Sequence, residues 1–239
     1  MFGIHLTARR VLTVALSVAL LVTAAQWSTR AAESAVVIPP PSMDDKKGEG
    51  NLQTAVLAGG CFWGVQGVFE HVKGVRRVLS GYAGGEKSTA DYETVGTGST
   101  GHAESVQITY DPREVSYGTL LQIYFSVAHD PTQLNRQGPD SGSQYRSAIF
   151  VTDDAQRKVA DSYIAQLNQA HVFAAPIVTR VDSLRGFYPA EAYHQDFLIN
   201  NPRHPYIVFN DLPKIRNLQR VLPQLYRDAP VTVSASLTR

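Results

Sequence analysis

The chain has 239 residues, of which 44% are hydrophobic and 18% are charged, and its formal net charge is +1. This composition excludes a fibre and a globally disordered chain, and the length suits one or two domains with a sizeable core. The near-neutral charge gives no electrostatic basis for binding nucleic acid or an anionic membrane surface.

The N-terminus is predicted to be a signal peptide that spans residues 1–25. An apolar run, 11–22, follows two arginines and precedes the small residues of 23–25. The run is short beside the roughly 20 apolar residues that cross a bilayer, and it fits a secretory signal. We therefore expect an exported, periplasmic protein with no membrane contact after cleavage. An uncleaved segment that anchors the chain in the membrane is the alternative.

The rest of the chain is predicted to divide into three parts. Residues 26–50 are expected to form a flexible linker, because 38–50 is rich in proline, glycine and charge and offers little to bury. One folded domain is expected over 51–226, and a polar tail is expected to follow it over 227–239.

The single cysteine of the chain, Cys61, follows a predicted strand over 51–58 and two glycines. Apolar residues then recur at the spacing of one helix face, so Cys61 is expected in the first turn of a helix. Unpaired N–H groups and the positive end of the helix dipole favour a thiolate there. Phe62 and Trp63 lie off that apolar face and are expected to form an aromatic wall beside the sulfur. A buried, inert thiol is the alternative.

A second candidate is Glu104, which belongs to a predicted strand within 100–112. Because alternate residues of a strand share a face, Glu104 lies on the same side as Val106 and Ile108. Burial on that face raises the pKa of a carboxyl and keeps it protonated near neutral pH, as a general acid requires. Alternation alone leaves equally open that Glu104 lies at the wet end of the strand.

The remaining pattern predicts helices and strands that mix without a regular βαβ repeat. Helices are expected over 116–128, 153–170 and 188–200, strands over 145–151 and 176–181, and a long polar loop over 129–144. This mixture favours an α+β fold, in which one two-layer domain has a central, mostly antiparallel or mixed sheet flanked by helices.

Two local patterns are similar to cofactor motifs but lack the context that those motifs need. G-x-G-x-x-G occurs over 96–101, yet a predicted strand follows it where a helix is required. H-x-E occurs over 102–104, yet the chain has no C-x-x-C to complete a zinc-deaminase site. We therefore expect neither a bound metal nor a cofactor.

Six longer motifs occur in order along the chain. They are GGCFWG, GYAGG, TGHAE, HDPT, RQGPDSGSQYRSAI and AEAYHQDFLINNP. Together they resemble the peptide methionine sulfoxide reductases of the A type, and the resemblance runs from about residue 54 to residue 206. It implies a mixed α/β domain that reduces methionine sulfoxide, of the S-epimer alone, in proteins and as the free amino acid.

The resemblance also implies roles for single residues. Cys61 matches the nucleophile and Glu104 matches the acid that protonates the sulfoxide oxygen, so that turnover leaves a sulfenic acid on Cys61. The other matches are substrate-binding residues: Phe62 and Trp63 for the methyl group, Tyr82 and Tyr145 near the oxygen, Asp140 in the polar loop, and Tyr206 late in the chain.

Many members of this family carry a second cysteine near the C-terminus that attacks the sulfenic acid, and this chain has none. The resemblance therefore implies recycling by an external thiol, which is thioredoxin-like, glutaredoxin-like or a small thiol. The expected partners are this reductant and oxidised proteins and peptides that carry methionine sulfoxide. The expected state is a monomer that binds no nucleic acid.

Three other classes of protein remain open from the residues. A cysteine hydrolase needs a histidine base, for which the candidates are His102, His194 and His204, and an oxyanion hole. Neither requirement has a local signature here. A one-cysteine peroxidase also forms a sulfenic acid, and a non-enzymatic binding protein would keep Cys61 in its core. Substrates distinguish the four classes: a sulfoxide for the reductase, an ester or amide for the hydrolase, a peroxide for the peroxidase, and none for the binding protein.

Overall fold

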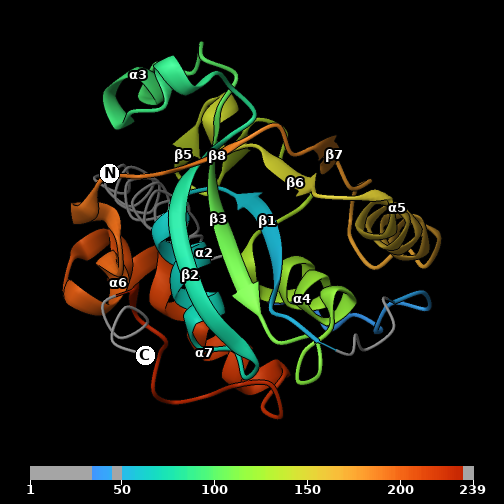
Figure 1. Ribbon diagram of the computed structural model, residues 1–239. Coiled ribbons are helices and arrows are strands. Elements are labelled where there is room, and N and C mark those ends of the chain that lie inside the picture. The colour runs from blue at the N-terminus through green and yellow to red at the C-terminus, as the bar shows by residue number, and fades with distance from the viewer. Residues whose placement is uncertain (1–33, 45–49, 234–239) are drawn as a thin grey trace, which may run out of the picture. The chain divides into compact units, whose positions relative to one another are not determined.

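The computed structural model describes residues 34–44 and 50–233, and the predicted signal peptide lies outside these residues (Figure 1). The strands in this part are β1 (Gln53–Gly59), β2 (Val75–Ala83), β3 (Ala103–Tyr110), β4 (Arg136–Gln137), β5 (Asp140–Ser141), β6 (Ser147–Val151), β7 (Arg180–Ser183) and β8 (Phe187–Pro189). The α-helices are α2 (Phe62–Glu70), α3 (Tyr92–Gly96), α4 (Tyr117–Ile123), α5 (Asp154–Gln169), α6 (Phe197–Asn200) and α7 (Leu212–Val221). Shorter or irregular helical turns are η1 (Lys87–Thr89), η2 (Tyr124–Ala128), η3 (Ser143–Tyr145), η4 (Ala192–His194) and η5 (Ile207–Asp211).

Six strands form one mixed sheet in the order β7-β6-β1-β3-β2-β8 (Figure 1). Neighbouring strands run antiparallel, except that β6 and β7 are parallel. The short strands β4 and β5 pair with each other inside the polar loop over 129–144. The predicted α+β fold with a mostly antiparallel or mixed sheet is confirmed.

β1 lies in the middle of the sheet because its residues are apolar toward both faces. Leu57 lies opposite Val106 of β3 on one side and opposite Ile149 of β6 on the other. Leu57 belongs to the main core, whereas Val56 and Ala58 belong to a smaller cluster of buried residues. Strands covered on both faces appear in a sequence as short continuous apolar runs, which is why β1 is readily predicted.

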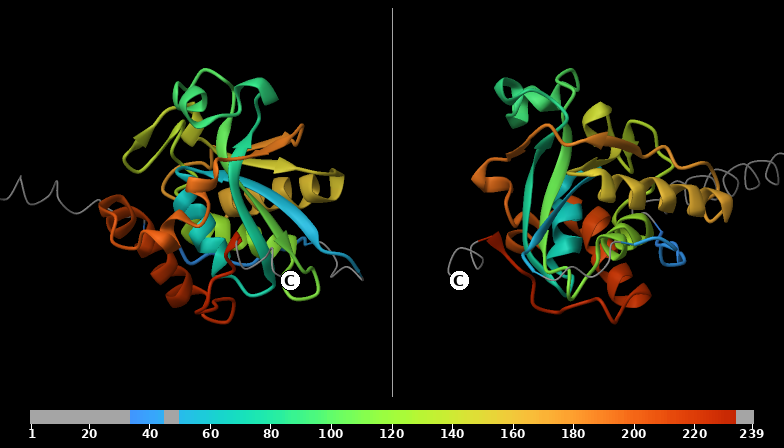
Figure 2. Two further views of the ribbon diagram at one scale, coloured as in Figure 1. Left: turned by 60° about the vertical axis from the view of Figure 1, so that its left-hand side comes forward. Right: turned by 45° about the vertical axis from the view of Figure 1, so that its right-hand side comes forward.

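One helical layer covers the sheet and brings α2 against it. α2 contacts β2 and β3, and α7 packs on α2. Both views in Figure 2 show α2 and α7 together on one side of the strands, with α5 near β6 and β7. Val65, Val68 and Phe69 of α2 are almost fully buried in the main core. None of the helices described has both the length and the apolar character that a bilayer crossing requires.

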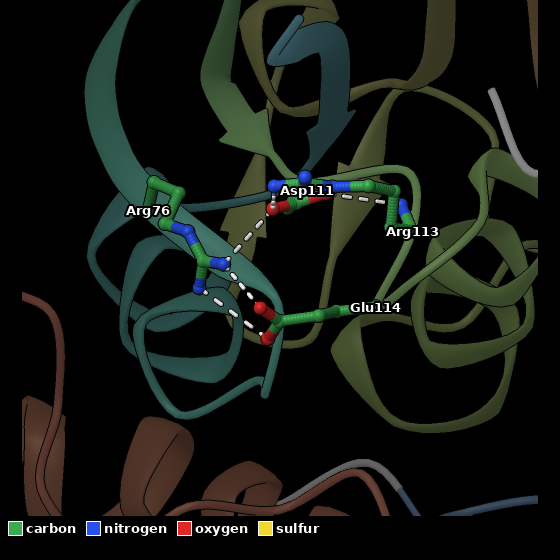
Figure 3. A network of polar contacts seen from close by, with 4 residues as sticks. All are labelled: Arg76, Asp111, Arg113 and Glu114. Carbon is green, nitrogen blue, oxygen red and sulfur yellow. Dashed lines mark hydrogen bonds and ion pairs between the residues drawn. The ribbon is translucent and has the colours of Figure 1, made fainter. Parts of the chain in front are cut away.

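A network of charged side chains ties the start of β2 to the end of β3 (Figure 3). Asp111 is 2% exposed and accepts hydrogen bonds from Arg113 at 2.8 Å and from Arg76 at 3.1 Å, while Arg76 also pairs with Glu114. The hydrogen bonds from Arg113 hold the pKa of Asp111 well below its usual range. The network therefore fixes β3 at the end opposite Glu104.

Residues 34–44, which the composition predicts as flexible linker, pack against the domain. Ile38 is 5% exposed, and its carbonyl accepts a hydrogen bond from Gln122 of α4 at 3.1 Å. The hydroxyl of Tyr163 in α5 donates to the carbonyl of Pro39 at 2.6 Å. Prolines lack N–H donors but keep their carbonyl acceptors, and side chains of the two helices satisfy those acceptors. The linker prediction is therefore wrong for this stretch.

The predicted polar tail is also partly packed. The N–H of Arg227 donates to the carbonyl of His71 at 2.9 Å, and the N–H of Val231 donates to that of Glu70 at 3.0 Å. The segment 227–233 therefore runs along the C-terminal end of α2. Residues 234–239 lie outside the described residues.

The helix predicted over 188–200 is replaced by an edge strand and two short helical turns. Tyr188 of β8 pairs with Tyr82 of β2, and Asp196 has the left-handed φ of 54° between η4 and α6. Pairing with β2 satisfies backbone groups that a helix would otherwise bond internally, so tertiary structure overrides the local pattern here. Likewise, β7 begins at Arg180, four residues beyond the start of the strand predicted over 176–181.

Candidate active site

The turn between β1 and α2 places a thiol at the start of a helix. Gly60 adopts a φ of +88°, which glycine reaches without steric cost, and a Cβ there would lie 2.5 Å from the Cβ of Gln137. Cys61 is the N-cap residue of α2 and is half-buried, and the nearby backbone N–H of Trp63 acts to lower the pKa of its thiol. The polar loop that contains Gln137 therefore packs directly on the turn that presents Cys61.

Glu104 lies beside this helix start. Its side chain is 4% exposed, and one carboxyl oxygen accepts a hydrogen bond from the N–H of Phe62 at 3.0 Å. Because Phe62 follows Cys61 directly, this bond holds the carboxyl next to the residue that carries the thiol. Burial raises the pKa of Glu104 to about 8, against the lowering effect of the bond from Phe62. The structure thus places Glu104 in the buried part of β3, in a form that carries a proton at pH 7.

The resting thiol is also protonated. Burial raises the pKa of the Cys61 thiol well above its ordinary value, and the carboxyl groups of Glu104, Asp211 and Asp140 raise it further. The backbone N–H of Trp63 lowers the pKa but does not offset these effects. The helix N-terminus alone predicts a resting thiolate. Burial and the nearby acidic groups outweigh the effect of the helix end, so the resting form is the thiol.

A cavity of about 290 Å³ opens at Cys61 and Glu104. It is lined by residues of five segments that are far apart in the sequence: Cys61, Phe62, Trp63, Tyr92, Glu104, Asp140, Tyr145, His204 and Tyr206. Seven of the eight residues predicted to form the site lie together here. The exception is Tyr82.

Tyr82 packs against Phe62, which lines the pocket, but does not line the pocket itself. Its side chain is fully buried, its ring lies 5.9 Å from that of Phe62, and its hydroxyl donates to Glu191 at 2.8 Å. The other carboxyl oxygen of Glu191 accepts from the N–H of Tyr92 at 2.9 Å. The expectation that Tyr82 meets the substrate oxygen is therefore wrong for this structure, and Tyr92 occupies the wall in its place.

Tyr92 and His204 line the pocket without a local signal that predicts it. Asp91 caps α3 by accepting from the N–H of Thr94 at 3.0 Å, and this capping pattern marks a helix start that contains Tyr92. The pattern does not reveal that α3 faces Cys61. His204 belongs to a loop between α6 and η5 that shows no periodicity at all.

The aromatic wall beside Cys61 is held rigidly. The indole ring of Trp63 stacks on Phe197 with ring centres 3.8 Å apart and an interplanar angle of 13°. Its N–H donates to Nδ1 of His194 at 3.0 Å, and Tyr206 meets it edge-on at 87°. A stacked ring with a bonded N–H has little freedom to rotate, so Trp63 forms a preorganised surface.

The polar wall is held by contacts between loops. The hydroxyl of Tyr206 donates to the carboxylate of Asp140. Arg146, next to Tyr145, donates to the carbonyls of Gly101 and His102 at 2.8 Å and 3.0 Å. These bonds fasten the loop that carries Tyr145 to the segment that leads into β3, and hence to Glu104.

Two of the three candidate histidine bases are engaged away from the thiol. His102 is 1% exposed and bonds to the carbonyl of Glu86 at 3.0 Å, and Nδ1 of His194 accepts from Trp63. His204 lines the pocket and is solvent-exposed. Within residues 34–44 and 50–233, no three His, Cys, Asp or Glu side chains are grouped so as to hold a metal ion.

Known proteins are similar to this chain over most of its length. The family model described as peptide methionine sulfoxide reductase matches residues 53–224. "Peptide methionine sulfoxide reductase MsrA 2" of Mesorhizobium japonicum is 64% identical, with 80% of this chain and 97% of that protein covered. A protein of the same name from Synechocystis sp. is 53% identical, with 77% and 87% covered.

Two solved structures share the fold. Reduced Mxr1 of Saccharomyces cerevisiae superposes with a TM-score of 0.58 at 32% identity, over 67% of this chain and 93% of that one. Methionine sulfoxide reductase A of Corynebacterium diphtheriae gives 0.56 at 32% identity, over 72% and 88%. A match this long, with a single thiol and a buried acid at its pocket, means that the chain belongs to the A-type peptide methionine sulfoxide reductase family.

Proposed function

We propose that this protein reduces the S-epimer of methionine sulfoxide, in proteins and as the free amino acid, through a sulfenic acid on Cys61. The observation that carries the proposal is that a thiol and a protonated carboxyl, Cys61 and Glu104, meet at one aromatic pocket. Family membership supports the same chemistry. A sulfoxide needs both groups, because its sulfur is a modest electrophile and its oxygen leaves poorly unless it is protonated.

The proposed step balances without a cofactor. Cys61 loses its proton, and the thiolate attacks the sulfoxide sulfur while Glu104 gives its own proton to the oxygen. The hydroxyl then passes to the cysteine sulfur as the S–S bond breaks, and methionine leaves as a thioether. The sulfur of Cys61 is oxidised by two electrons and the sulfoxide sulfur is reduced by two. The proton lost from the thiol restores Glu104.

The pocket walls fit the two other groups on the sulfur. The faces of Phe62 and Trp63 offer an apolar slot for the methyl group, next to Cys61 in the chain. The hydroxyls of Tyr92 and Tyr145 can donate to the oxygen, because burial keeps the pKa of each hydroxyl above its ordinary value and hence each group protonated. Fixed positions for methyl and oxygen leave one position for the rest of the side chain, which is the basis of epimer selection.

Recycling is proposed to come from outside the chain. With one cysteine in 239 residues, no second thiol of the same molecule can attack the sulfenic acid. An external thiol forms a mixed disulfide with Cys61, and a second thiol then releases it. A thioredoxin-like or glutaredoxin-like protein or a small thiol serves equally in this chemistry. We further propose that the protein works as a periplasmic monomer on oxidised proteins.

The test supplies purified protein with dithiothreitol and a peptide that contains either the S or the R epimer of methionine sulfoxide. The S peptide should be converted to the methionine peptide, and the R peptide should remain. Cys61→Ser should keep the far-ultraviolet circular dichroism spectrum and lose all turnover, because a serine hydroxyl cannot replace the thiol. Turnover of hydrogen peroxide or of an ester by the wild type, without turnover of sulfoxide, would contradict the proposal.

A further inference from the structure

The composition of the pocket lining suits a cation. Its aromatic members are Phe62, Trp63, Tyr92, Tyr145 and Tyr206, and its acidic members are Glu104 and Asp140. Among the described residues that line it, none is lysine or arginine. Pockets of aromatic rings with carboxylates are how proteins recognise methylated cations, because ring faces and carboxylates attract the charge without hydrogen bonding to it.

The geometry of Trp63 makes one ring face available. Phe197 covers the other face at 3.8 Å between ring centres, so the opposite face is the one that a ligand in the pocket can reach. His194 accepts the indole N–H at 3.0 Å and keeps the ring in this orientation. Tryptophan gives the strongest cation–π attraction of the aromatic side chains. A cation seated there also meets Tyr206, whose ring stands at 87° to Trp63.

The charged groups around the pocket are mainly acidic, which also favours a cation. Asp211 is fully buried behind the start of α2, where a Cβ on Gly64 would lie 2.1 Å from its carboxyl oxygen. Lys214 is 6% exposed, lies 3.8 Å from Asp211, and also acts on Asp140, whose pKa it lowers against the larger raising effect of burial. Asp140, the second acidic residue of the lining, is held in place by the hydroxyl of Tyr206. Three carboxyl groups, those of Glu104, Asp211 and Asp140, thus act on the Cys61 thiol, and one buried lysine accompanies them.

We propose that the pocket is a binding site for methylsulfonium ions, such as the side chain of S-methylmethionine. A protonated sulfoxide is a three-coordinate, positively charged sulfur that carries a methyl group, an alkyl chain and a hydroxyl. A sulfonium ion has the same shape and charge, with a second methyl in place of the hydroxyl. It has no oxygen to transfer, so it occupies the site as a competitive ligand. The proposal rests on the proposed function, in that the same pocket seats the reacting sulfur.

The same carboxyl should give the two ligands opposite pH dependence. Reduction needs Glu104 with its proton, whereas a sulfonium ion is held more tightly once Glu104 is ionised, and burial places the pKa of Glu104 at about 8. The ionisable groups that face Glu104 are the Cys61 thiol, the carboxyls of Asp140 and Asp211, and the hydroxyls of Tyr82, Tyr92 and Tyr145. Ionisation of Cys61 also favours a cation, so the test must separate the two groups.

The probes are two N-acetyl amides of nearly equal shape: S-methylmethionine, which is charged, and homoleucine, in which a CH replaces the sulfonium sulfur. Calorimetry on the full-length protein should give the sulfonium a Kd at least about tenfold lower at pH 9, and a smaller preference at pH 7. Glu104→Gln should abolish the rise in the preference for the sulfonium between pH 7 and pH 9. Cys61→Ser should retain most of that rise.

Equal affinities of the two amides at both pH values would overturn the proposal, and so would a pH-dependent gain that persists unchanged in Glu104→Gln. Sulfoxide turnover separates this outcome from failure of the proposed function. A protein that reduces the S sulfoxide but binds both amides equally has the proposed activity and lacks the sulfonium site. A protein that prefers the sulfonium but reduces no sulfoxide has the site and lacks the activity.

Discussion

Burial of Glu104 has a consequence for stability as well as for chemistry. Its folded-state pKa is about 8, whereas an unfolded glutamate titrates near 4.3. Between about pH 4 and pH 8 the folded state therefore binds one proton more than the unfolded state does. The stability that this carboxyl contributes is fully present below about pH 4 and is lost as the pH rises through 8. Glu104→Gln cannot titrate, so its Tm should fall less than that of wild type between pH 5 and pH 9. Parallel Tm curves for the two proteins would contradict this assignment.

The same substitution should slow the reductive step. Glutamine keeps the shape of the side chain but gives up no proton, so single-turnover reduction should be ~10²-fold slower or more. The wild-type rate should also fall above pH 8, and the variant should lack that pH dependence. Alkylation of Cys61 by iodoacetamide is the control, because it needs no acid and should change by a few-fold at most. Equal slowing of both reactions would mean that Glu104 only holds the site together.

Tyr82 and Tyr145 offer a matched pair of substitutions to phenylalanine. Tyr82 donates to Glu191 beneath the pocket, so Tyr82→Phe should cost about 1–3 kcal/mol of stability and leave kcat/KM within a few-fold of wild type. Tyr145 lines the pocket, so Tyr145→Phe should keep the stability and lower kcat/KM by ~10-fold or more. Thermal unfolding and steady-state kinetics measure both quantities. The reverse pattern would return Tyr82 to the substrate site.

At the scale of elements, the strand-to-helix turn depends on Gly60. Gly60→Ala should cost at least roughly 1–2 kcal/mol, because φ is +88° and the new Cβ meets Gln137. Since the turn presents Cys61, kcat/KM should fall too. Gly96→Ala in α3 is the control, because a Cβ there meets nothing within 4 Å and should change stability by under about 1 kcal/mol. Comparable losses in the two variants would show that the turn has no special requirement for glycine.

Helices and strands whose own residues show a clear apolar periodicity can be predicted from the sequence. Those that form only because they pair with a distant segment cannot. β1, α2 and β3 follow clear apolar periodicity, and this periodicity also places Cys61 at a helix start and Glu104 on the buried face. β2 has an irregularity in its register near Arg77 and an uneven burial pattern, so no simple alternation marks it. β8 exists because it pairs with β2, and this pairing overrides the helical pattern over 188–200.

The site divides in the same way. Residues next to Cys61 and Glu104 in the chain could be inferred from their own elements. Tyr92 reaches the pocket because Glu191 holds its backbone, and Glu191 lies 99 residues further along the chain. Tyr82 is predicted to lie at the substrate oxygen but does not line the pocket. Its position in a motif indicates that the tyrosine is important but not which way its hydroxyl points. Contacts of this kind are fixed only when the separate segments fold against one another.

At the scale of the whole molecule, segments outside the predicted domain complete its packing. Residues 34–44 bond to α4 and α5, and 227–233 bonds to the C-terminal end of α2. α2 therefore carries Cys61 at its N-cap, and segment 227–233 holds its C-terminal end. No stretch of either segment supplies a thiol, because Cys61 is the single cysteine of all 239 residues.

This cysteine count sets the stoichiometry of the reaction in the absence of a reductant. Excess S sulfoxide should give one methionine per chain and then stop, while thiols fall from one to zero. The spent enzyme should carry a sulfenic acid at Cys61, which dimedone traps and intact-protein mass spectrometry identifies. An added thiol should first form a mixed disulfide at Cys61 and then restore turnover. Methionine formed with the Cys61 thiol still intact, or turnover that continues without reductant, would contradict the mechanism, because every sulfoxide oxygen must pass to this one sulfur.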